Sequence, residues 1–272
     1  QTADTCEVWR IIGVFDGKIK LIRNSVIGDY SWDTSASTVN DGNGYNQWGE
    51  NGDYKGADLM KLLNPGYSDN TDLNSRGTSI KVNNSLYYNA GSGICYSGSK
   101  NSTWTCNFTN IGLKNDQTRN LISKTLYYLG GYDDSSIYSD QMYEYERGTN
   151  LGTSPYASSI WEGYIALPYA SDYGYAADFN SCTQNLYDYD NTSCTSTNWM
   201  KSIFTSDYNW LLPPYSGNSY NAWRVGPSGY VGDSYVMYGA NGTAPVLHLD
   251  SNIMIDNKTT GTSANPYKLI VK

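Results

Sequence analysis

The sequence predicts an α+β fold of mostly short antiparallel strands with two helices and long loops, in a single domain spanning residues 1–272. Three observations support this prediction. Apolar and polar residues alternate over short runs, which is typical of half-buried strands. Gly, Pro and Asn interrupt these runs, so the strands are expected to be short. No repeat of fixed period and no linker-like tract divides the chain, which is long enough to bury a core of its own.

The first predicted element is a β-hairpin at residues 8–23, "VWRIIGVFDGKIKLIR", in which two apolar-alternating runs flank the turn Asp16-Gly17. A long loop follows. The segment 57–66, "ADLMKLLNPG", predicts a short amphipathic helix that Asn64-Pro65-Gly66 stops.

The second helix is predicted at residues 115–131, "NDQTRNLISKTLYYLGG", where apolar residues recur at helical spacing before two glycines. From Trp223 to Val231, Gly and Pro restrict the chain to short antiparallel pieces joined by turns. The closing "NPYKLIVK" predicts a last strand. We expect the first and last strands to pair, as in one closed domain.

The composition points to an extracellular protein. The net charge of −8 disfavours nucleic acid and acidic membrane surfaces as partners, because both require a basic face. Charged residues make up only 16% of the chain, whereas Tyr and Gly supply 27 residues each. The surface must therefore be covered largely by Ser, Thr, Asn, Gly and Tyr, which is typical of secreted proteins and of carbohydrate- or antibody-like contact surfaces.

No run approaches the roughly 18 apolar residues that a membrane span needs. The chain begins "QTADTC", without the apolar core of a signal peptide. We therefore expect a processed mature product or an excised segment.

Five cysteines are present. Cys95 with Cys106 and Cys182 with Cys194 are predicted to form disulfides, each closing a short polar loop, with reduced buried cysteines as the alternative. Cys6 is then free or joined to another chain. Neither pair has the spacing of a zinc site, and the chain holds a single His, so no metal or other cofactor is expected.

Enzymatic chemistry finds little support, and the protein is predicted not to be an enzyme, with no catalytic residue assigned. His248 is expected to be a structural residue on a strand, because nothing in the sequence places a nucleophile beside it. A glycosidase needs two carboxylates a fixed distance apart. Glu144 and Glu146 would share a face if residues 137–147 form a strand, and Glu162 and Asp172 have aromatic neighbours.

The acidic residues have structural roles as an alternative to catalytic ones. In one such alternative, Glu144 pairs with Arg147 on the surface. Calcium sites would need six to eight oxygens, and residues 39–47 and 187–193 cluster Asp and Asn. Neither segment matches an EF-hand loop, and polar turns are the alternative.

The candidate ligand-binding surface lies in the segment "NSYNAWRVGPSGYVGDSYVMYG", residues 218–239, and in the residues just before it. Its valines and Trp223 suit inward positions, whereas its tyrosines suit an exposed face. Tyr offers large contact area, and Arg can anchor a carboxylate or stack on a ring. The alternative is that these rings only cap a small core. The candidate ligand-binding residues are Trp210, Tyr215, Tyr220, Arg224, Tyr230, Tyr235 and Tyr238.

Several segments resemble a known family. "WRIIGVFDGKIKLIRNSVIGDYSWDTSAS", "ADLMKLLNPGY", "SDYGYA" and "APVLHLDSNIMI…GTSANPYKL" are similar to uncharacterised Tyr/Asn/Ser-rich extracellular domains of surface proteins from Gram-positive gut bacteria. The resemblance spans residues 8–270, including both Cys loops. It implies a C-type-lectin-like fold, with the termini in one sheet, two helices and a long loop-rich segment from Trp210 to Val246.

Departures from related folds limit what the resemblance implies. The lectin calcium motifs "EPN", "QPD" and "WND" are absent, so calcium-dependent sugar binding is not implied. The paired reactive cysteines of formylglycine-generating enzymes have no counterpart. Some family members carry pilin-like N-terminal helices, which this chain lacks.

Two functional hypotheses follow. The first is an extracellular, cell-surface binding module, adhesin-like, that recognises a glycan or a host or bacterial surface protein through its Tyr-rich surface. The alternative is a structural subunit of an extracellular filament or surface assembly, which low charge, high Tyr content and Cys6 near the N-terminus would suit. A glycan-cleaving enzyme is a third reading and requires two carboxylates that converge in a pocket.

Overall fold

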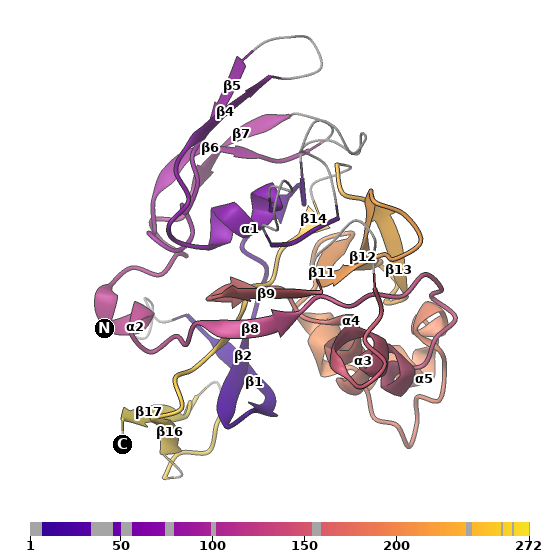
Figure 1. The fold of residues 1–272 in the computed structure, drawn as a ribbon. Helices are drawn as coiled ribbons and strands as arrows, with labels where there is room; N and C mark the ends of the chain where they lie inside the picture. Colours follow the sequence, from indigo (N-terminus) through magenta and orange to yellow (C-terminus); the bar gives the residue numbers. More distant parts are fainter. Residues whose placement is uncertain are drawn as a thin grey trace.

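The computed structural model describes residues 7–33, 46–49, 56–73, 79–98, 102–153, 159–237, 241–256, 258–262 and 264–271 (Figure 1). These parts form a mixed α+β structure of mostly short antiparallel strands, as predicted. Cys6, Tyr238 and most of the predicted calcium segment 39–47 lie outside the described residues.

Two larger sheets organise the described chain. One has the order β1-β2-β15-β10, formed by Trp9–Phe15, Lys18–Arg23, Val246–His248 and Ile165–Ala166. The other has the order β13-β12-β11-β14-β3, formed by Val231–Tyr235, Asn221–Val225, Asn209–Pro214, Asn241–Gly242 and Asp29–Tyr30. All neighbours pair antiparallel except β11 with β14.

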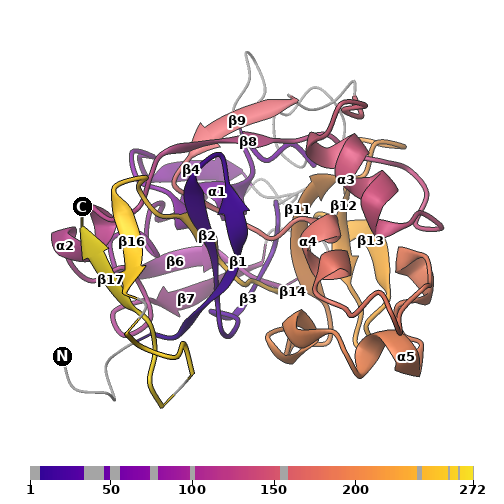
Figure 2. The ribbon, with the colours of Figure 1, turned by 90° about the horizontal axis from the view of Figure 1, so that it is seen from below.

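Shorter elements surround these sheets (Figures 1 and 2). The two-stranded ribbons are β4–β5 (Asn70–Leu73, Ser79–Val82), β6–β7 (Ser92–Tyr96, Thr103–Asn107), β8–β9 (Thr125–Tyr128, Ile160–Gly163) and β16–β17 (Ile253–Asp256, Lys268–Val271). The α-helices are α1 Asp58–Leu63, α2 Asp116–Arg119, α3 Ser139–Arg147, α4 Ala170–Tyr175 and α5 Thr192–Thr195, and the 3₁₀ helices are η2 Leu186–Asp188 and η3 Trp199–Ser202.

The predicted N-terminal hairpin is confirmed as β1–β2. Asp16 and Gly17 form its turn with φ angles of 50° and 73°. Positive φ at both central turn residues matches the right-handed twist of the flanking strands, and this requirement makes Asp-Gly a strong hairpin signal.

The predicted helix at residues 57–66 is confirmed as α1, although all six of its residues are buried rather than one face. Asn64 ends the helix and ties it to β10. Its side-chain N–H groups donate to the carbonyl oxygens of Met60 and Ile165, while its oxygen accepts from the backbone N–H of Ile165. A polar side chain thus satisfies backbone groups that the helix end leaves open.

The predicted helix at residues 115–131 is wrong beyond its first turn. Asn115 caps α2 by accepting the backbone N–H of Thr118, but the helix stops at Arg119. Tyr127 and Tyr128 belong instead to β8, which pairs with β9. Burial along β8 alternates with period two, so pairing with a distant strand overrode an apolar spacing that fitted a helix.

The expected pairing of the first and last strands is also wrong among the described strands. β1 pairs with β2, and β17 pairs with β16. In both cases the partner is the sequence neighbour, which costs less loop-closure entropy than joining the two ends of the chain. The prediction of two helices is wrong as well, because the described residues contain five α-helices.

The core consists of two hydrophobic clusters that share strands. Along β11, Trp210 and Leu212 pack in the first cluster and Leu211 in the second. Along β15, Leu247 packs in the first cluster and Val246 in the second. Strands covered on both faces carry continuous apolar runs, as in "WLLPP", rather than an alternating pattern.

His248 lies on a strand, as predicted, and is buried. Its Nδ1 lies 3.2 Å from the hydroxyl of Tyr127. Burial, and then the nearby charge of Lys20, lower the pKa of His248 to about 3. The imidazole is therefore neutral at physiological pH and packs as a core residue.

Candidate functional site

Trp210 was predicted to bind ligand, and this assignment is wrong. Its side chain is fully buried and contacts Trp32, and its indole N–H donates to the carbonyl oxygen of Tyr30 at 2.8 Å. Because both faces of β11 are covered, every side chain on that strand becomes part of the core.

The other predicted ligand residues form two separate groups on the β12–β13 side of the molecule. Tyr220 and Tyr235 stack with ring centroids 5.2 Å apart, and Tyr235 is 41% exposed. Tyr215 is half-buried, and its hydroxyl donates to the carbonyl oxygen of Asp133 at 2.5 Å. The valines and Trp223 of this segment point inward, as predicted.

Arg224 and Tyr230 meet two tyrosines that the sequence did not indicate. The guanidinium of Arg224 lies 3.7 Å from the ring centroid of Tyr208, and Tyr187 lies 6.0 Å from Tyr230. Burial lowers the pKa of Arg224. No carboxylate among the described residues forms an ion pair with it. Of the predicted residues, Tyr220 and Tyr235 thus form one stacked pair, and Arg224 and Tyr230 form a second group with Tyr208 and Tyr187.

A second candidate site is lined by residues of β1, α3, α4 and η3. Figure 2 shows the β1–β2 hairpin beside helices α3 and α4. Two adjacent cavities of about 230 and 330 Å³ share Tyr175. We call them the first and second cavity of the ring-lined groove. The first is lined by Ile12, Phe15, Tyr143, Arg147, Asp172, Tyr175, Ala176 and Trp199. The second is lined by Tyr138, Ser139, Asp140, Tyr175, Phe179, Cys182, Thr183, Gln184 and Tyr189.

Rings dominate the exposed wall of the groove. Tyr175 is 45% exposed and contacts Tyr143 and Phe179 edge to face, at centroid distances of 6.3 and 5.3 Å. Edge-to-face contacts of this kind fix the orientation of a ring. Tyr175 is therefore held as a ridge between the two cavities.

Helix α3 positions the charged floor of the first cavity. Tyr143 and Arg147 are four residues apart and so share a helical face. Glu146 points instead to the N-terminus of α4, where its carboxylate accepts the backbone N–H groups of Ala170 and Ser171 and the hydroxyl of Ser171. The first N–H groups of a helix have no partner within that helix. By accepting them, Glu146 fixes the N-terminal end of α4 against the C-terminal end of α3.

Asp172 joins two cations in this floor. Its carboxylate accepts Lys20 Nζ at 2.5 Å and Arg147 Nη2 at 2.6 Å, and the side chains of Asp172 and Lys20 are only 1% exposed. Burial by itself would raise the pKa of Asp172, but the charges of Arg147 and Lys20 hold it well below its usual range. Burial lowers the pKa of Lys20 to about 8, against the opposing effect of Asp172.

Rings surround the Arg147 guanidinium. Its central carbon lies 4.2 Å from the ring centroid of Tyr169, 4.8 Å from that of Tyr143 and 5.1 Å from that of Phe15. Such cation–π contacts gain strength when the cation is desolvated. The guanidinium is therefore held rigidly at the cavity wall.

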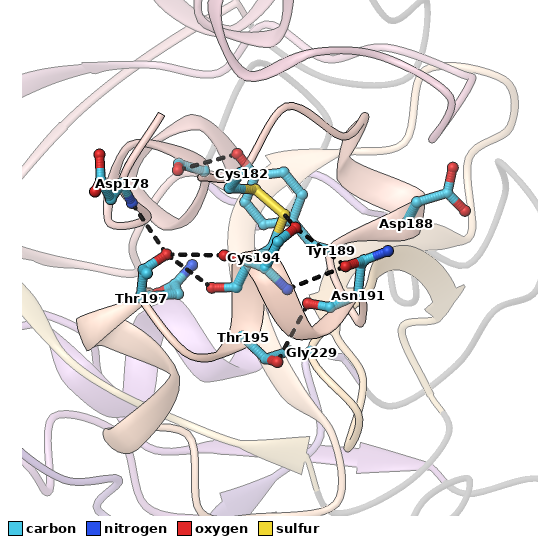
Figure 3. Close-up of a disulfide and its surroundings, with 12 residues drawn as sticks. Asp178, Cys182, Asp188, Tyr189, Asn191, Cys194, Thr195, Thr197 and Gly229 are labelled. Atoms are coloured by element: carbon cyan, nitrogen blue, oxygen red, sulfur yellow. Dashed lines mark hydrogen bonds between the residues drawn. A yellow bond between two sulfur atoms is a disulfide. The ribbon is translucent and has the colours of Figure 1, made fainter. Parts of the chain in front are cut away.

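The second cavity is built on a disulfide. Cys182 and Cys194 are joined, with Cα atoms 4.5 Å apart, and Cys95 is joined to Cys106, so both predicted pairs are confirmed. Figure 3 shows the Cys182–Cys194 bond beside Thr197, whose hydroxyl donates to the carbonyl oxygen of Cys194. The bond anchors the loop that carries one wall of the cavity.

The carboxylates considered for a glycosidase lie apart from one another in the structure. Residues 139–147 form a helix rather than a strand, so Glu144 and Glu146 do not share a strand face. Glu144 accepts the backbone N–H of Thr149 at 2.8 Å rather than pairing with Arg147. Glu162 forms an exposed ion pair with Lys124.

Segment 187–193 runs from η2 into α5, and its Asn191 caps α5. In the described part of the chain, no group of three or more His, Cys, Asp or Glu side chains could hold a metal ion. Within the same residues, the helices are all too short or too polar to cross a membrane.

The sequence did not single out the ring-lined groove. Of its charged residues, Asp172 was considered only as a carboxylate among aromatic neighbours and Arg147 only as a surface partner of Glu144, and Lys20 lies in the hairpin segment "KIKLIR". The four-residue spacing of Tyr143 and Arg147 is a usable signal only once the segment is recognised as a helix.

No known protein family, curated protein or solved structure matches the chain. The likeness to the Gram-positive surface domains therefore stays a prediction.

Proposed function

We propose that the protein is an extracellular binding module, without catalytic activity, that recognises a glycan in the ring-lined groove. The observation that carries this proposal is the pair of cavities, about 230 and 330 Å³, that share the exposed ring of Tyr175. Each cavity is at or below the small end of the usual range for ligand pockets, which suits one sugar ring apiece. Two neighbouring units of a polymer would then straddle Tyr175.

The chemistry of the walls supports this class of ligand. A sugar ring presents an apolar C–H face and a rim of hydroxyls, so it packs on aromatic rings and hydrogen-bonds at their edges. Tyr side chains provide both an apolar body and a polar tip. The groove supplies rings from Phe15, Tyr143 and Trp199 in the first cavity, and from Tyr138 and Phe179 in the second.

The carboxylates of the groove support binding rather than cleavage. Asp172 is held in ion pairs with two cations, and Glu146 is fully buried behind the cavity and bound to the start of α4. Neither of these two carboxylates is available as a proton donor or nucleophile, which leaves Asp140 as the one other carboxylate in the lining of the two cavities, whereas glycoside hydrolysis requires a pair.

The disulfides support an extracellular location, because such bonds persist in oxidising compartments. We extend this to the cell surface as part of the proposal. We also retain a C-type-lectin-like architecture as a proposal. It is supported by the mixed α+β structure of mostly short antiparallel strands, whereas the segment from Trp210 to Val246, expected to be loop-rich, contributes β11 to β14 to one sheet, and no sheet joins both termini among the described strands.

The test is a titration of oligosaccharides, chosen from an array, against the wild type and Tyr175→Ala. The substitution is expected to weaken binding about tenfold, because truncating a central aromatic contact commonly costs more than ~1.4 kcal/mol. Tyr128→Ala is the matched control, since Tyr128 is 40% exposed but lies on β8 and lines neither cavity.

Failure of the folded wild type to bind any oligosaccharide would overturn the proposal. Binding to a panel of host surface proteins, with none to oligosaccharides, would show that the ligand is a protein. Equal binding by Tyr175→Ala and wild type would place the glycan on another surface, the Arg224 and Tyr230 cluster being the first to examine.

The structural-subunit alternative is favoured by one observation. Ribbon β16–β17 exposes apolar side chains on both faces, with Met254, Leu269, Ile270 and Val271 each more than 40% exposed. Exposed apolar strands without a further partner are natural sites of strand pairing between chains.

If a second copy of the chain covers this ribbon, Ile270→Glu should weaken self-association at least tenfold in sedimentation velocity. Lys268→Gln, on the same strand, should leave it unchanged. A wild-type chain that stays monomeric at high micromolar concentration would remove this alternative.

A further inference from the structure

Arg147 keeps hydrogen-bond donors that no described residue accepts. Both of its side-chain hydrogen bonds leave from Nη2, to Ser171 Oγ at 3.0 Å and to Asp172 at 2.6 Å. Its Nε is buried and has no hydrogen-bond partner among the described residues. A guanidinium carries five N–H donors in a fixed plane. The Nη1 group donates to no described residue, so on a side chain that is only 8% exposed and lines a cavity it can serve an acceptor that enters from the cavity.

The charges around the first cavity favour an anionic acceptor. Asp172 is the only carboxylate in the lining of this cavity, and it is already bound to Lys20 and Arg147. A further cation, Arg10, lies 5.7 Å from the ring of Trp199 at the cavity wall. A ligand carboxylate would therefore meet positive charge on two sides.

We propose that the first cavity binds a carboxylate through the Nη1 group of Arg147, so that the glycan recognised in the groove carries an acidic sugar such as a uronic or sialic acid. This inference rests on the function proposed above. Arg suits this role better than Lys, because its guanidinium can hold Ser171 and Asp172 through Nη2 while the two N–H groups of Nη1 remain for a ligand. The second cavity, which contains Asp140 and no cation in its lining, would take the adjacent neutral sugar.

Glu146 would tune this binding with pH. It packs behind the cavity against Arg147 on its own helix, Ser171 and Asp172 on α4, and the charge of Lys20 on β2. Burial raises the pKa of Glu146 to about 7. As pH rises from 6 to 8, Glu146 loses its proton and adds a negative charge beside Arg147. A ligand carboxylate should then bind about tenfold more weakly, and deprotonation of Lys20 above pH 8 acts in the same direction.

The test uses sialyllactose and a glucuronic-acid tetrasaccharide, each beside its carboxyl-reduced form, and a sulfated neutral tetrasaccharide. Titration calorimetry at pH 6 is expected to show at least one acidic oligosaccharide binding tenfold or more tightly than its reduced form. Equal binding of acidic and reduced forms would overturn the acidic-sugar inference and leave the glycan-binding function standing. Preference for the sulfated sugar alone would also overturn it. Absence of binding by every oligosaccharide would overturn both.

Two variants locate the effect. Arg147→Lys keeps the charge but removes the Nη1 group, and it should lower affinity for the acidic form at least tenfold while affinity for the reduced form stays within twofold. Glu146→Gln, compared at pH 6 and pH 8, should abolish the pH dependence, whereas Glu162→Gln, in an exposed ion pair on β9, should keep it. Unchanged acidic preference in Arg147→Lys, or wild-type pH dependence in Glu146→Gln, would contradict the proposal.

Discussion

Asp172→Asn is expected to destabilise the protein by about 3–5 kcal/mol, because it leaves two buried cations without their shared carboxylate. Lys20 and Arg147 lie 2.5 and 2.6 Å from Asp172, and both lose most of their solvent on folding. Urea denaturation at pH 7 measures the change. The control is Glu162→Gln, which removes an exposed ion pair and should change the free energy of unfolding by less than about 1 kcal/mol. A loss below about 1 kcal/mol for Asp172→Asn would show that the ion cluster contributes little.

Asp172→Asn should also change how the free energy of unfolding depends on pH in the acid range. The pKa of Asp172 is depressed in the folded state, so its contribution is fully present above its ordinary value of 3.8 and is lost as pH falls toward the folded pKa. Stability of the wild type should therefore fall below about pH 4 more steeply than that of Asp172→Asn. If the free energy of unfolding fell equally steeply with pH in the two proteins, the depressed pKa of Asp172 would be contradicted.

Removing the Cys182–Cys194 disulfide by Cys182→Ala/Cys194→Ala is expected to cost about 3 kcal/mol, because the bond closes a loop of 12-residue separation. It should also weaken glycan binding, since Cys182 forms part of the wall of the second cavity. The comparison is Cys95→Ala/Cys106→Ala, which removes a loop of 11-residue separation in ribbon β6–β7, away from α3 and α4 (Figure 1). This second pair should lose similar stability but keep wild-type affinity. Equal loss of affinity in both would show that the effect follows global stability rather than the groove.

Several features could be read from local sequence. The Asp16-Gly17 hairpin, the helix that Asn64 ends and the two disulfides all depend on residues close in the chain, such as a turn dipeptide, a helix stop or a short loop between cysteines. The structural role of His248 followed from its apolar strand neighbours. In each case the decisive interactions span a few residues, so the pattern and the structure coincide.

Other features required partners that are distant in the sequence. Tyr127 lies in a strand because β9 pairs with it, although its neighbours have helical spacing. Trp210 became core because both faces of β11 are covered. The tyrosines of the predicted surface were separated into two groups by the register of β12 and β13. No local pattern encodes which strand or cluster will cover a given face.

What the sequence by itself determined is the class of fold, the local turns and caps, the disulfides and a surface rich in tyrosine. What only the tertiary structure decided is where those tyrosines gather. The ring-lined groove draws Phe15 and Lys20 from the first hairpin, Arg147 from α3, Asp172 from α4 and Trp199 from η3. Packing of these distant segments buries the charges that pair and leaves the donors of Arg147 facing a cavity, and that arrangement exists only once the chain has folded.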